Sequence, residues 1–234
     1  MNQFNLGLGL AWYLAFVLST VFHEAAHAFL AYQLGDKTAY HGGQVSLNPA
    51  PHIRQEPFGM VVVPVLSFIY GGWMFGWAST PYDPAWAYQN PRRAGLMALG
   101  GPGANLLLVL VAALLIRLGI AGGFFAAPDS ITFSRVAEAV NPGLPYALAT
   151  FLSILFTLNL ILFLFNLLPL PPLDGSAILP IAMTTESANR FQALMHQPMF
   201  AIIGLLIAWQ FFGRLFAPVH QLAVNLLYPG LHYR

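Results

Sequence analysis

Residues 6–34 are the feature that most limits how this chain can fold, because the stretch is apolar almost throughout. At 1.5 Å per residue, a helix over residues 8–33 is long enough to cross a hydrocarbon core of about 30 Å. The stretch is also too long for the apolar region of a signal peptide. We therefore expect it to be retained in the protein as a membrane-spanning helix.

The only acidic side chain and the only histidines of this stretch lie together, as His23, Glu24 and His27. Residues four apart share one face of a helix, so the two imidazoles can present nitrogens to one metal ion. Glu24 lies about 100° round from His23, within reach of a water on that metal without binding the metal itself. The alternative is a set of hydrogen-bonded core residues. A carboxylate in a bilayer costs at least a few kcal/mol, which favours a functional site.

The composition agrees with a membrane protein. Hydrophobic residues make up 58% of the 234 residues and charged residues only 7%, whereas ordinary soluble domains carry about a quarter. A net charge of +1 leaves no basic surface that would indicate a nucleic-acid partner. The chain has no cysteine, so a metal ion must be held by histidine, aspartate or glutamate side chains.

Further apolar segments predict the rest of the architecture. Residues 94–117, 145–168 and 198–228 are expected to span the membrane. Residues 58–77 are apolar but interrupted by Pro64 and by two glycines, so we expect a re-entrant segment that enters the membrane and returns. The prediction is an all-α polytopic membrane protein, a bundle of transmembrane helices with a re-entrant segment and short extended strands near the active site.

The connections between these segments are richer in proline and glycine. We expect residues 40–59 to form turns and short extended pieces rather than helix, and residues 118–145 to form a loop with a short amphipathic helix near 133–139. Residues 1–234 are taken as a single domain, with the motifs in a core of about residues 8–180. Three prolines within residues 169–172 break the third span, and a break at membrane depth is tolerated only beside a protein-lined or wet cavity.

A catalytic zinc ion takes three protein ligands and keeps one open position, so the two histidines need a third partner. Of the eight acidic residues, only Glu24 and Asp174 lie inside apolar stretches, which makes Asp174 the expected third ligand. Its alternative role is an N-cap that restarts a helix after the prolines. The remaining histidines are expected at the surface or at the membrane interface: His41, His52, His196, His220 and His232.

These motifs together resemble the site-2 protease family of intramembrane zinc metalloproteases, in its short branch without PDZ or CBS domains. The matching motifs are His23-Glu24-x-x-His27, Gly101-Pro102-x-x-Asn105 and Asn166-Leu-Leu-Pro-x-Pro-Pro-Leu-Asp174-Gly175, and the resemblance covers residues from about 10 to 180. It implies one zinc ion per chain held by His23, His27 and Asp174, with Glu24 as general base. It also implies that Asn105 binds the substrate backbone or the oxyanion, whereas an interhelical hydrogen bond is the alternative for Asn105.

The order of the segments also predicts how the site is assembled. His27 lies eight residues before Gly35, so the metal is nearer the face toward which the first span runs. If residues 58–77 are re-entrant, the third span returns to that same face and brings Asp174 beside the histidines. Basic residues are too evenly divided to orient the chain. The resemblance implies a prokaryotic cell membrane, with the site near the cytoplasmic face and the N-terminus outside.

The predicted function is hydrolysis of peptide bonds in or near a transmembrane segment of a membrane protein substrate, within the lipid bilayer. Because helical carbonyls are already hydrogen-bonded, the substrate must unwind locally, and the extended stretches 45–47 and 76–80 offer edges to which it could add as a strand. The alternatives are a metal-binding membrane transporter and a catalytically silent scaffold. Glu24 distinguishes a protease from the transporter, because a transporter has no need of a carboxylate that lies beside its metal ligands without binding the metal.

Overall fold

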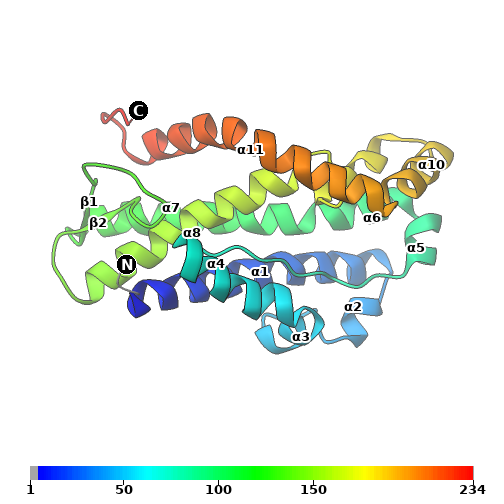
Figure 1. Ribbon diagram of the computed structural model, residues 1–234, viewed down its shortest axis with the longest axis horizontal. Helices are drawn as coiled ribbons and strands as arrows, with labels where there is room; N and C mark the ends of the chain where they lie inside the picture. Colours follow the sequence, from blue (N-terminus) through cyan, green and yellow to red (C-terminus); the bar gives the residue numbers. More distant parts are fainter. Residues whose placement is uncertain (1–4, 234) are drawn as a thin grey trace.

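Four long helices dominate the computed structural model, which describes residues 5–233 (Figure 1). They are α1 (Leu6–Leu34), α7 (Gly100–Ala121), α8 (Leu144–Asn166) and α11 (Pro198–Leu227). Each is long and apolar enough to cross a membrane, with α7 counted together with the short helix α6 (Pro91–Ala98) before it. The prediction of an all-α polytopic membrane protein is confirmed.

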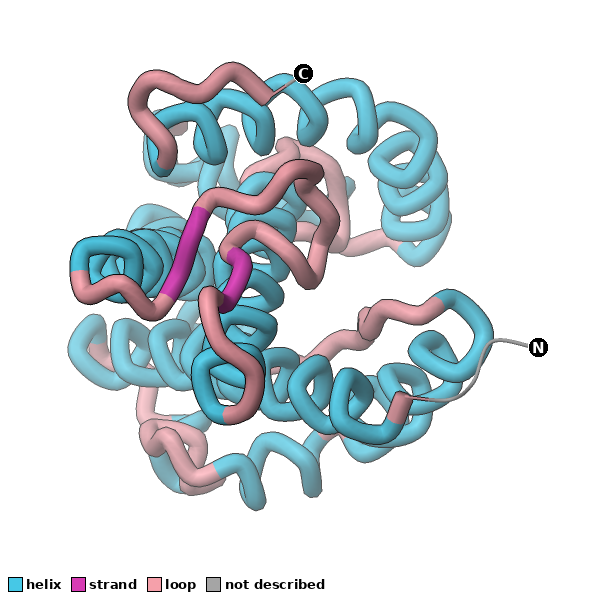
Figure 2. The backbone as a smooth tube through the Cα atoms, turned by 90° about the vertical axis from the view of Figure 1, so that its left-hand side faces the viewer, coloured by secondary structure: helices cyan, strands magenta, loops and turns pink. Residues whose placement is uncertain are grey.

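Helices α1, α7 and α8 pack together as the core of the bundle, and α11 lies along its outer side (Figures 1 and 2). The largest fully buried side chains include Trp12 and Phe16 of α1, Ile116 of α7, and Ile154 and Phe156 of α8. Along α11 most large apolar side chains are exposed. In a bilayer these side chains face lipid, so their exposure agrees with a membrane-spanning helix.

Residues 58–77 turn back inside the bundle instead of crossing it. The π-helix η1 (Phe58–Val62) leads into α4 (Val63–Gly71), which ends at Gly72 in the left-handed region with φ 74°. The chain then returns in extended form, and the Asp83 amide donates to the Asp36 carboxylate at 2.8 Å, beside the end of α1. The chain before and after the segment, at α2 and α5, therefore lies at one end of the bundle (Figure 1), and the re-entrant prediction is confirmed.

The re-entrant helix and the extended segment that returns from it approach closely, because Gly59 and Gly76 face each other. A Cβ on Gly76 would lie 2.1 Å from the Gly59 carbonyl oxygen, and one on Gly59 would lie 2.2 Å from the Trp77 oxygen. The Trp77 amide donates to that Gly59 oxygen at 3.2 Å. Residues 73–83 are thus held against the re-entrant helix without forming a β-strand.

Most of the remaining short elements gather at the two ends of the bundle. At one end, on the right in Figure 1, lie α2 (Thr38–His41), α5 (Pro84–Gln89) and α10 (Thr185–Met195), and α9 (Asp174–Ile178) and the 3₁₀ helix η2 (Leu179–Ala182) pack against α6 there. Helix α3 (Pro49–Gln55) lies below α1, nearer the middle of the molecule. At the other end, β1 (Phe125–Ala126) pairs antiparallel with β2 (Glu138–Ala139), and this end faces the viewer in Figure 2.

Two expectations for the connections are wrong. Residues 40–59 contain helical turns, including α3, where the Asn48 side chain accepts from the Ala50 amide and Pro49 takes the first helical position. Proline is tolerated there, because a backbone N–H at the first helical position would have no hydrogen-bond partner within the helix in any case. Residues 133–139 form no amphipathic helix. The Ala137 amide binds the Ser153 hydroxyl at 2.9 Å and Ala139 pairs with β1, so tertiary contacts replace the local hydrogen bonds of a helix.

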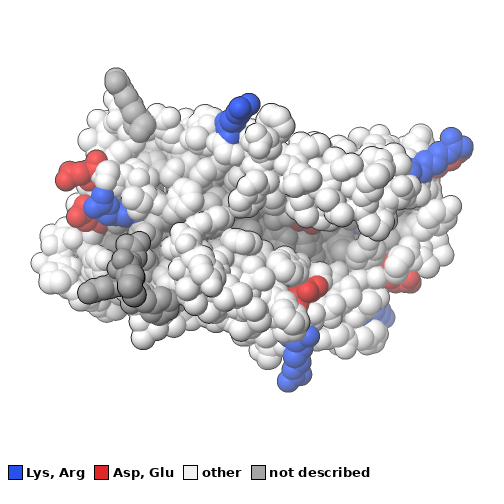
Figure 3. Space-filling view, in the orientation of Figure 1, with Lys and Arg blue, Asp and Glu red and all other residues white. Residues whose placement is uncertain are grey.

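The outer surface has the charge distribution of a membrane protein. In the view of Figure 3, the Lys, Arg, Asp and Glu side chains lie mainly toward the two ends and along the lower edge, and most of the flank is uncharged. A hollow opens between α11 and the elements below it, as Figures 1 and 3 show together. Its position places an opening in the flank that would face lipid.

Candidate metal centre

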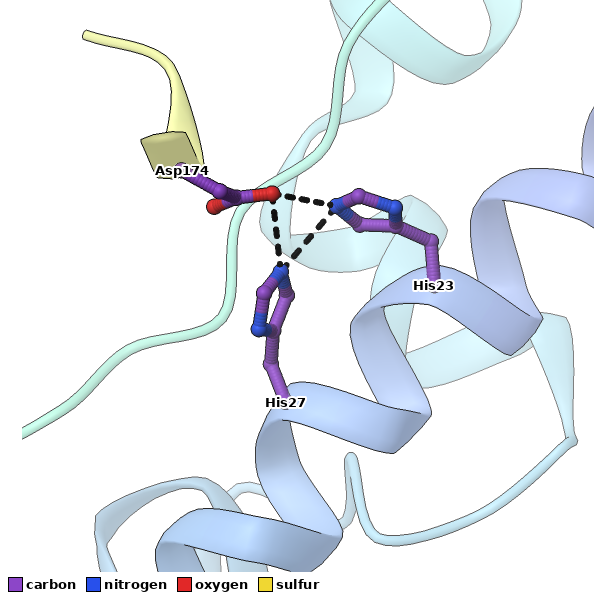
Figure 4. Close-up of side chains that lie close together, drawn as sticks. All are labelled: His23, His27 and Asp174. Carbon is purple, nitrogen blue, oxygen red and sulfur yellow. Dashed lines mark hydrogen bonds and ion pairs between the residues drawn. The ribbon is translucent and has the colours of Figure 1, made fainter. Parts of the chain in front are cut away.

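Three potential metal ligands converge from two elements far apart in the sequence. His23 and His27 project from the same side of α1, and Asp174 reaches them from the first turn of α9 (Figure 4). The Nε2 atoms of the two imidazoles are 3.0 Å apart, and Asp174 Oδ2 lies 3.1 Å from the first and 3.3 Å from the second. All three side chains are mostly buried, with the two histidine residues 8% and 5% exposed. The spacing predicted from the sequence therefore brings these three residues together.

The Nδ1 atoms show which ring nitrogens face the centre of the site. His23 Nδ1 lies 2.6 Å from Asn105 Oδ1, and His27 Nδ1 lies 2.8 Å from the Met97 carbonyl oxygen. Both oxygens only accept, so each Nδ1 must carry the proton and donate it. The Gly101 amide is 3.4 Å from His27 Nδ1, a longer contact that the shorter carbonyl bond overrides. When the imidazoles are neutral, both Nε2 atoms therefore point their lone pairs at the centre.

Two lone pairs and a carboxylate oxygen at about 3 Å from one another repel unless a cation stands among them. Nitrogen and oxygen ligands of this kind are those that zinc takes, with three protein ligands and an open position in catalytic sites. Gly101 adds a second observation. A Cβ there would lie only 2.3 Å from both Nε2 atoms, so only glycine lets α7 approach the imidazoles. The residues present fit a zinc ion.

A chain of buried side chains, two amides and one hydroxyl, holds His23 through its Nδ1 atom, on the side away from the centre of the site. The Asn105 NH₂ group donates to Asn159 Oδ1 at 2.8 Å, which fixes the Asn105 oxygen toward His23. Asn159 in turn donates to the Ser19 hydroxyl at 2.8 Å and to the Leu155 carbonyl at 2.8 Å. Asn105, Asn159 and Ser19 are all 0% exposed. Every donor in this chain has an acceptor, so the network ties α1, α7 and α8 together at the depth of the site.

Glu24 is 5% exposed and directly follows His23 on α1, but it does not belong to the group of three potential ligands. Its Oε2 atom accepts a hydrogen bond from Thr80 Oγ1 at 2.8 Å, and the same hydroxyl lies 2.9 Å from the Glu24 backbone oxygen. Thr80 belongs to the extended segment that returns from the re-entrant helix. The general base expected from the motif is therefore held by a residue from outside α1.

Asp174 is placed by close backbone packing. A Cβ on Gly175 would lie 2.2 Å from the Leu168 oxygen, and one on Gly204 of α11 would lie 1.9 Å from the Pro171 oxygen. The prolines end α8 and the loop folds back on it, so the aspartate faces the histidines. The N-cap of α9 is Leu173 and no side chain caps the helix, which excludes the N-cap alternative for Asp174.

The other histidines do not join the site. His52 is 1% exposed, so its expected surface position is wrong. Its Nε2 donates from α3 to the Ser46 carbonyl at 3.0 Å. His220 is half-buried against Phe216 on α11, with stacked rings 5.1 Å apart. Within the described residues, His23, His27 and Asp174 are the one group placed to share a metal ion.

Four residues that hold the site together were not predicted from the sequence: Ser19, Thr80, Met97 and Asn159. Asn159 carried a signal, because an amide inside the apolar segment 145–168 has to be hydrogen-bonded and so indicates a partner within the bundle. Thr80 and Met97 carried none. A threonine in a polar connection is ordinary, and Met97 acts through its backbone carbonyl, which every residue possesses.

Comparison with known proteins identifies the family of the chain. The sequence matches the model described as "Peptidase family M50" over residues 11–207. The chain belongs to peptidase family M50. This is the site-2 protease family, so the resemblance seen in the motifs is confirmed.

Relatives in this family include "Putative zinc metalloprotease YwhC" of Bacillus subtilis (strain 168), which is 38% identical over 164 residues, 70% of this chain and 64% of that protein. Another is "Putative zinc metalloprotease Rip2" of Mycolicibacterium smegmatis. It is 29% identical over 191 residues, which are 82% of this chain and 64% of that protein. The chain thus covers less than two thirds of the length of these relatives. No solved structure matches it significantly.

Proposed function

We propose that this M50 family member is an intramembrane zinc metalloendopeptidase that cuts peptide bonds in or near a transmembrane segment of another protein. The observation that carries the proposal is the convergence of three ligands beside a carboxylate that does not join them, inside a bundle of apolar helices. The names of the two relatives support the same activity for those proteins. A metal transporter also needs ligands, but nothing in the described residues gives it a use for Glu24.

In this proposal His23, His27 and Asp174 hold one zinc ion per chain. When bound, zinc lowers the pKa of its water to about 7 and polarises a carbonyl. Glu24 accepts the proton of the attacking water, because it is the one carboxylate beside the ligands that remains free of them. The Nδ1 hydrogen bonds to Asn105 and to the Met97 carbonyl keep both imidazoles in the tautomer that binds a cation.

For Asn105 we propose first a positioning role. Its oxygen holds His23 and its NH₂ group holds Asn159, and the residue is 0% exposed. Binding of the oxyanion by Asn105 stays a prediction. It would require the NH₂ group to leave Asn159 when substrate binds.

The proposed substrate is a membrane protein that presents an unwound stretch of chain. The backbone amides of Ala78, Ser79 and Thr80 have no hydrogen-bond partner among the described residues. A substrate in extended form can add to such an edge, with its main chain supplying the missing acceptors. This edge leads to Thr80, whose hydroxyl binds Glu24, so a strand added there lies near the proposed base.

We also propose a cell membrane location with the metal end of the bundle toward the cytoplasm. Helix α1 runs toward the metal end, and α11 returns to the end where α1 begins (Figure 1). With the metal end cytoplasmic, the start of α1 and the end of α11 would both lie on the outer side.

The test is cleavage by the purified protein in detergent with zinc, using a panel of single-span membrane proteins, with products identified by mass spectrometry. Wild type should cut at least one of them within or beside its span. Glu24→Gln should keep the fold and the zinc but lose cleavage, because an amide cannot accept the proton of the water. Cleavage by Glu24→Gln at the wild-type rate would remove the proposed mechanism.

A further inference from the structure

Thr80 stands out because it reaches the proposed base from a different part of the chain. The hydroxyl lies 2.8 Å from Glu24 Oε2, and no other described residue donates a hydrogen bond to that carboxylate. It also lies 2.9 Å from the Glu24 carbonyl oxygen. A hydroxyl has one proton to donate, and an ionised carboxylate is the stronger acceptor of the two.

The segment that carries Thr80 is fixed on both sides of it. Before it, the Trp77 amide donates to the Gly59 carbonyl at 3.2 Å. After it, the Asp83 amide donates to the Asp36 carboxylate at 2.8 Å. Between them, the Ser79 hydroxyl donates to Glu56 at 2.6 Å. Thr80 is therefore anchored to the re-entrant helix on one side and to the end of α1 on the other.

A glutamate side chain has three rotatable bonds, and the His23 and His27 imidazoles occupy the adjoining face of the same helix. A single donor at 2.8 Å selects one orientation of the carboxylate by holding Oε2, and leaves Oε1 available to a proton. A base must lie within hydrogen-bond reach of the proton it takes, so the fixed orientation bears on the rate of reaction more than on the binding of substrate.

We propose that Thr80 is a positioning residue for Glu24: its hydroxyl holds the carboxylate in the orientation in which it accepts the proton from water. This inference rests on the proposed function, in which Glu24 is the general base. It makes the re-entrant segment part of the catalytic machinery, because the segment delivers the group that orients the base.

The test compares Thr80→Val, which replaces the hydroxyl by a methyl group of similar size, with Thr80→Ser, which keeps the hydroxyl. Thr157→Val is the matched control, since the Thr157 hydroxyl is buried in α8 and has no hydrogen-bond partner within residues 5–233. The reporter is a synthetic peptide with about 20 apolar residues between a fluorophore and a quencher, which wild type cleaves and Glu24→Gln does not. For each variant we would measure kcat, KM, zinc content and thermal midpoint.

We expect kcat of Thr80→Val to fall by about 10- to 100-fold, the range for loss of a hydrogen bond to a charged group, with KM and zinc content unchanged. The thermal midpoint should fall modestly, because the buried Glu24 carboxylate loses its one hydrogen-bond donor among the described residues. Thr80→Ser should recover most of the wild-type kcat, and Thr157→Val should match wild type in kcat, KM and zinc content.

Wild-type kcat in Thr80→Val would overturn the proposal, and so would a Thr80→Ser protein as slow as Thr80→Val. If Thr80→Val loses zinc or unfolds, Thr80→Ala replaces it, because alanine and serine differ only in the hydroxyl. Equal kcat for those two would also overturn the proposal. Failure of the proposed function itself gives a different result, in which wild type and Glu24→Gln behave alike.

Discussion

Gly101 is the residue at which the candidate metal centre leaves no room for a side chain. It lies in the first turn of α7, with its backbone against the edges of both imidazoles. The perturbation is Gly101→Ala, which adds one methyl group. Gly103→Ala is the control, since a Cβ at Gly103 on the same helix would meet nothing within 4 Å.

The size of the effect follows from the distances. The new Cβ would lie 2.3 Å from Nε2 of His23 and of His27, whereas ordinary contact begins at 3.4 Å, a shortfall of 1.1 Å. Relief requires either the imidazoles to turn or α7 to retreat by about that much. Asn105 is on the same helix, so a retreat also lengthens its 2.6 Å bond to His23. Overpacking of this kind costs about 1–3 kcal/mol, and loss of a bond that orients a ligand weakens metal binding about 10- to 100-fold.

The assay is zinc stoichiometry by mass spectrometry after dialysis against graded concentrations of a chelator, together with the thermal midpoint. Gly101→Ala should lose zinc at a lower chelator concentration than wild type. Gly103→Ala should retain zinc and gain up to about 1 kcal/mol from the better helix former. The reasoning is refuted if Gly101→Ala holds zinc as tightly as Gly103→Ala does.

Three further predictions follow from single contacts. Asp174→Ala should lose most of its zinc, since it removes one of three ligands, and undiminished zinc would exclude Asp174 as a ligand. Asn159→Leu leaves its buried hydrogen-bond partners unpaired, so the free energy of unfolding should drop by about 1–3 kcal/mol and zinc affinity should drop by about 10- to 100-fold. Wild-type zinc affinity in this variant would contradict the positioning network. Burial raises the pKa of Asp36, but hydrogen bonds from Thr38 and from the Asp83 amide outweigh it, so the folded-state pKa lies below its usual 3.8. This stabilisation is present above pH 3.8 and is lost as pH falls through the folded-state pKa, so thermal midpoints of wild type and Asp36→Asn should converge in acid, and parallel profiles would contradict it.

The parts of the site that the sequence predicted are those fixed by local geometry. The helical repeat alone puts His23 and His27 on one face, with no knowledge of how helices pack. Asp174 was predicted because burying an acidic side chain in a membrane is costly, so an acid beside an interrupted apolar segment is expected to have a function. These inferences need only the period of a helix and the cost of burying charge.

The partners of these residues depend on how the helices are rotated and spaced, which a single sequence does not encode in any short pattern. Asn105 could have faced substrate or a neighbouring helix, and the choice depends on the angle between α7 and α8, which brings Asn159 to 2.8 Å. Thr80 meets Glu24 only because the re-entrant segment returns past α1. The helix at residues 49–55 was missed for another reason, since proline opens helices as readily as it ends them.

The sidedness of the re-entrant segment gives the last prediction. The Asp83 amide bonds the Asp36 carboxylate, so the chain before and after the segment lies at one end of the bundle. Single cysteines introduced at Lys37 and Ala85, both exposed in this cysteine-free chain, should therefore be labelled by an impermeant thiol reagent from the same side of a sealed vesicle.

A cysteine at Phe124, which is 58% exposed at the end that holds β1, serves as the reference for the other side, because α7 crosses between the two ends. If Lys37 and Ala85 were labelled from opposite sides, residues 58–77 would have to cross the membrane. Helix α8 would then carry Asp174 to the face away from His23, and three ligands 3.0–3.3 Å apart could not form. The labelling result thus tests the assembly of the metal centre as directly as it tests the topology.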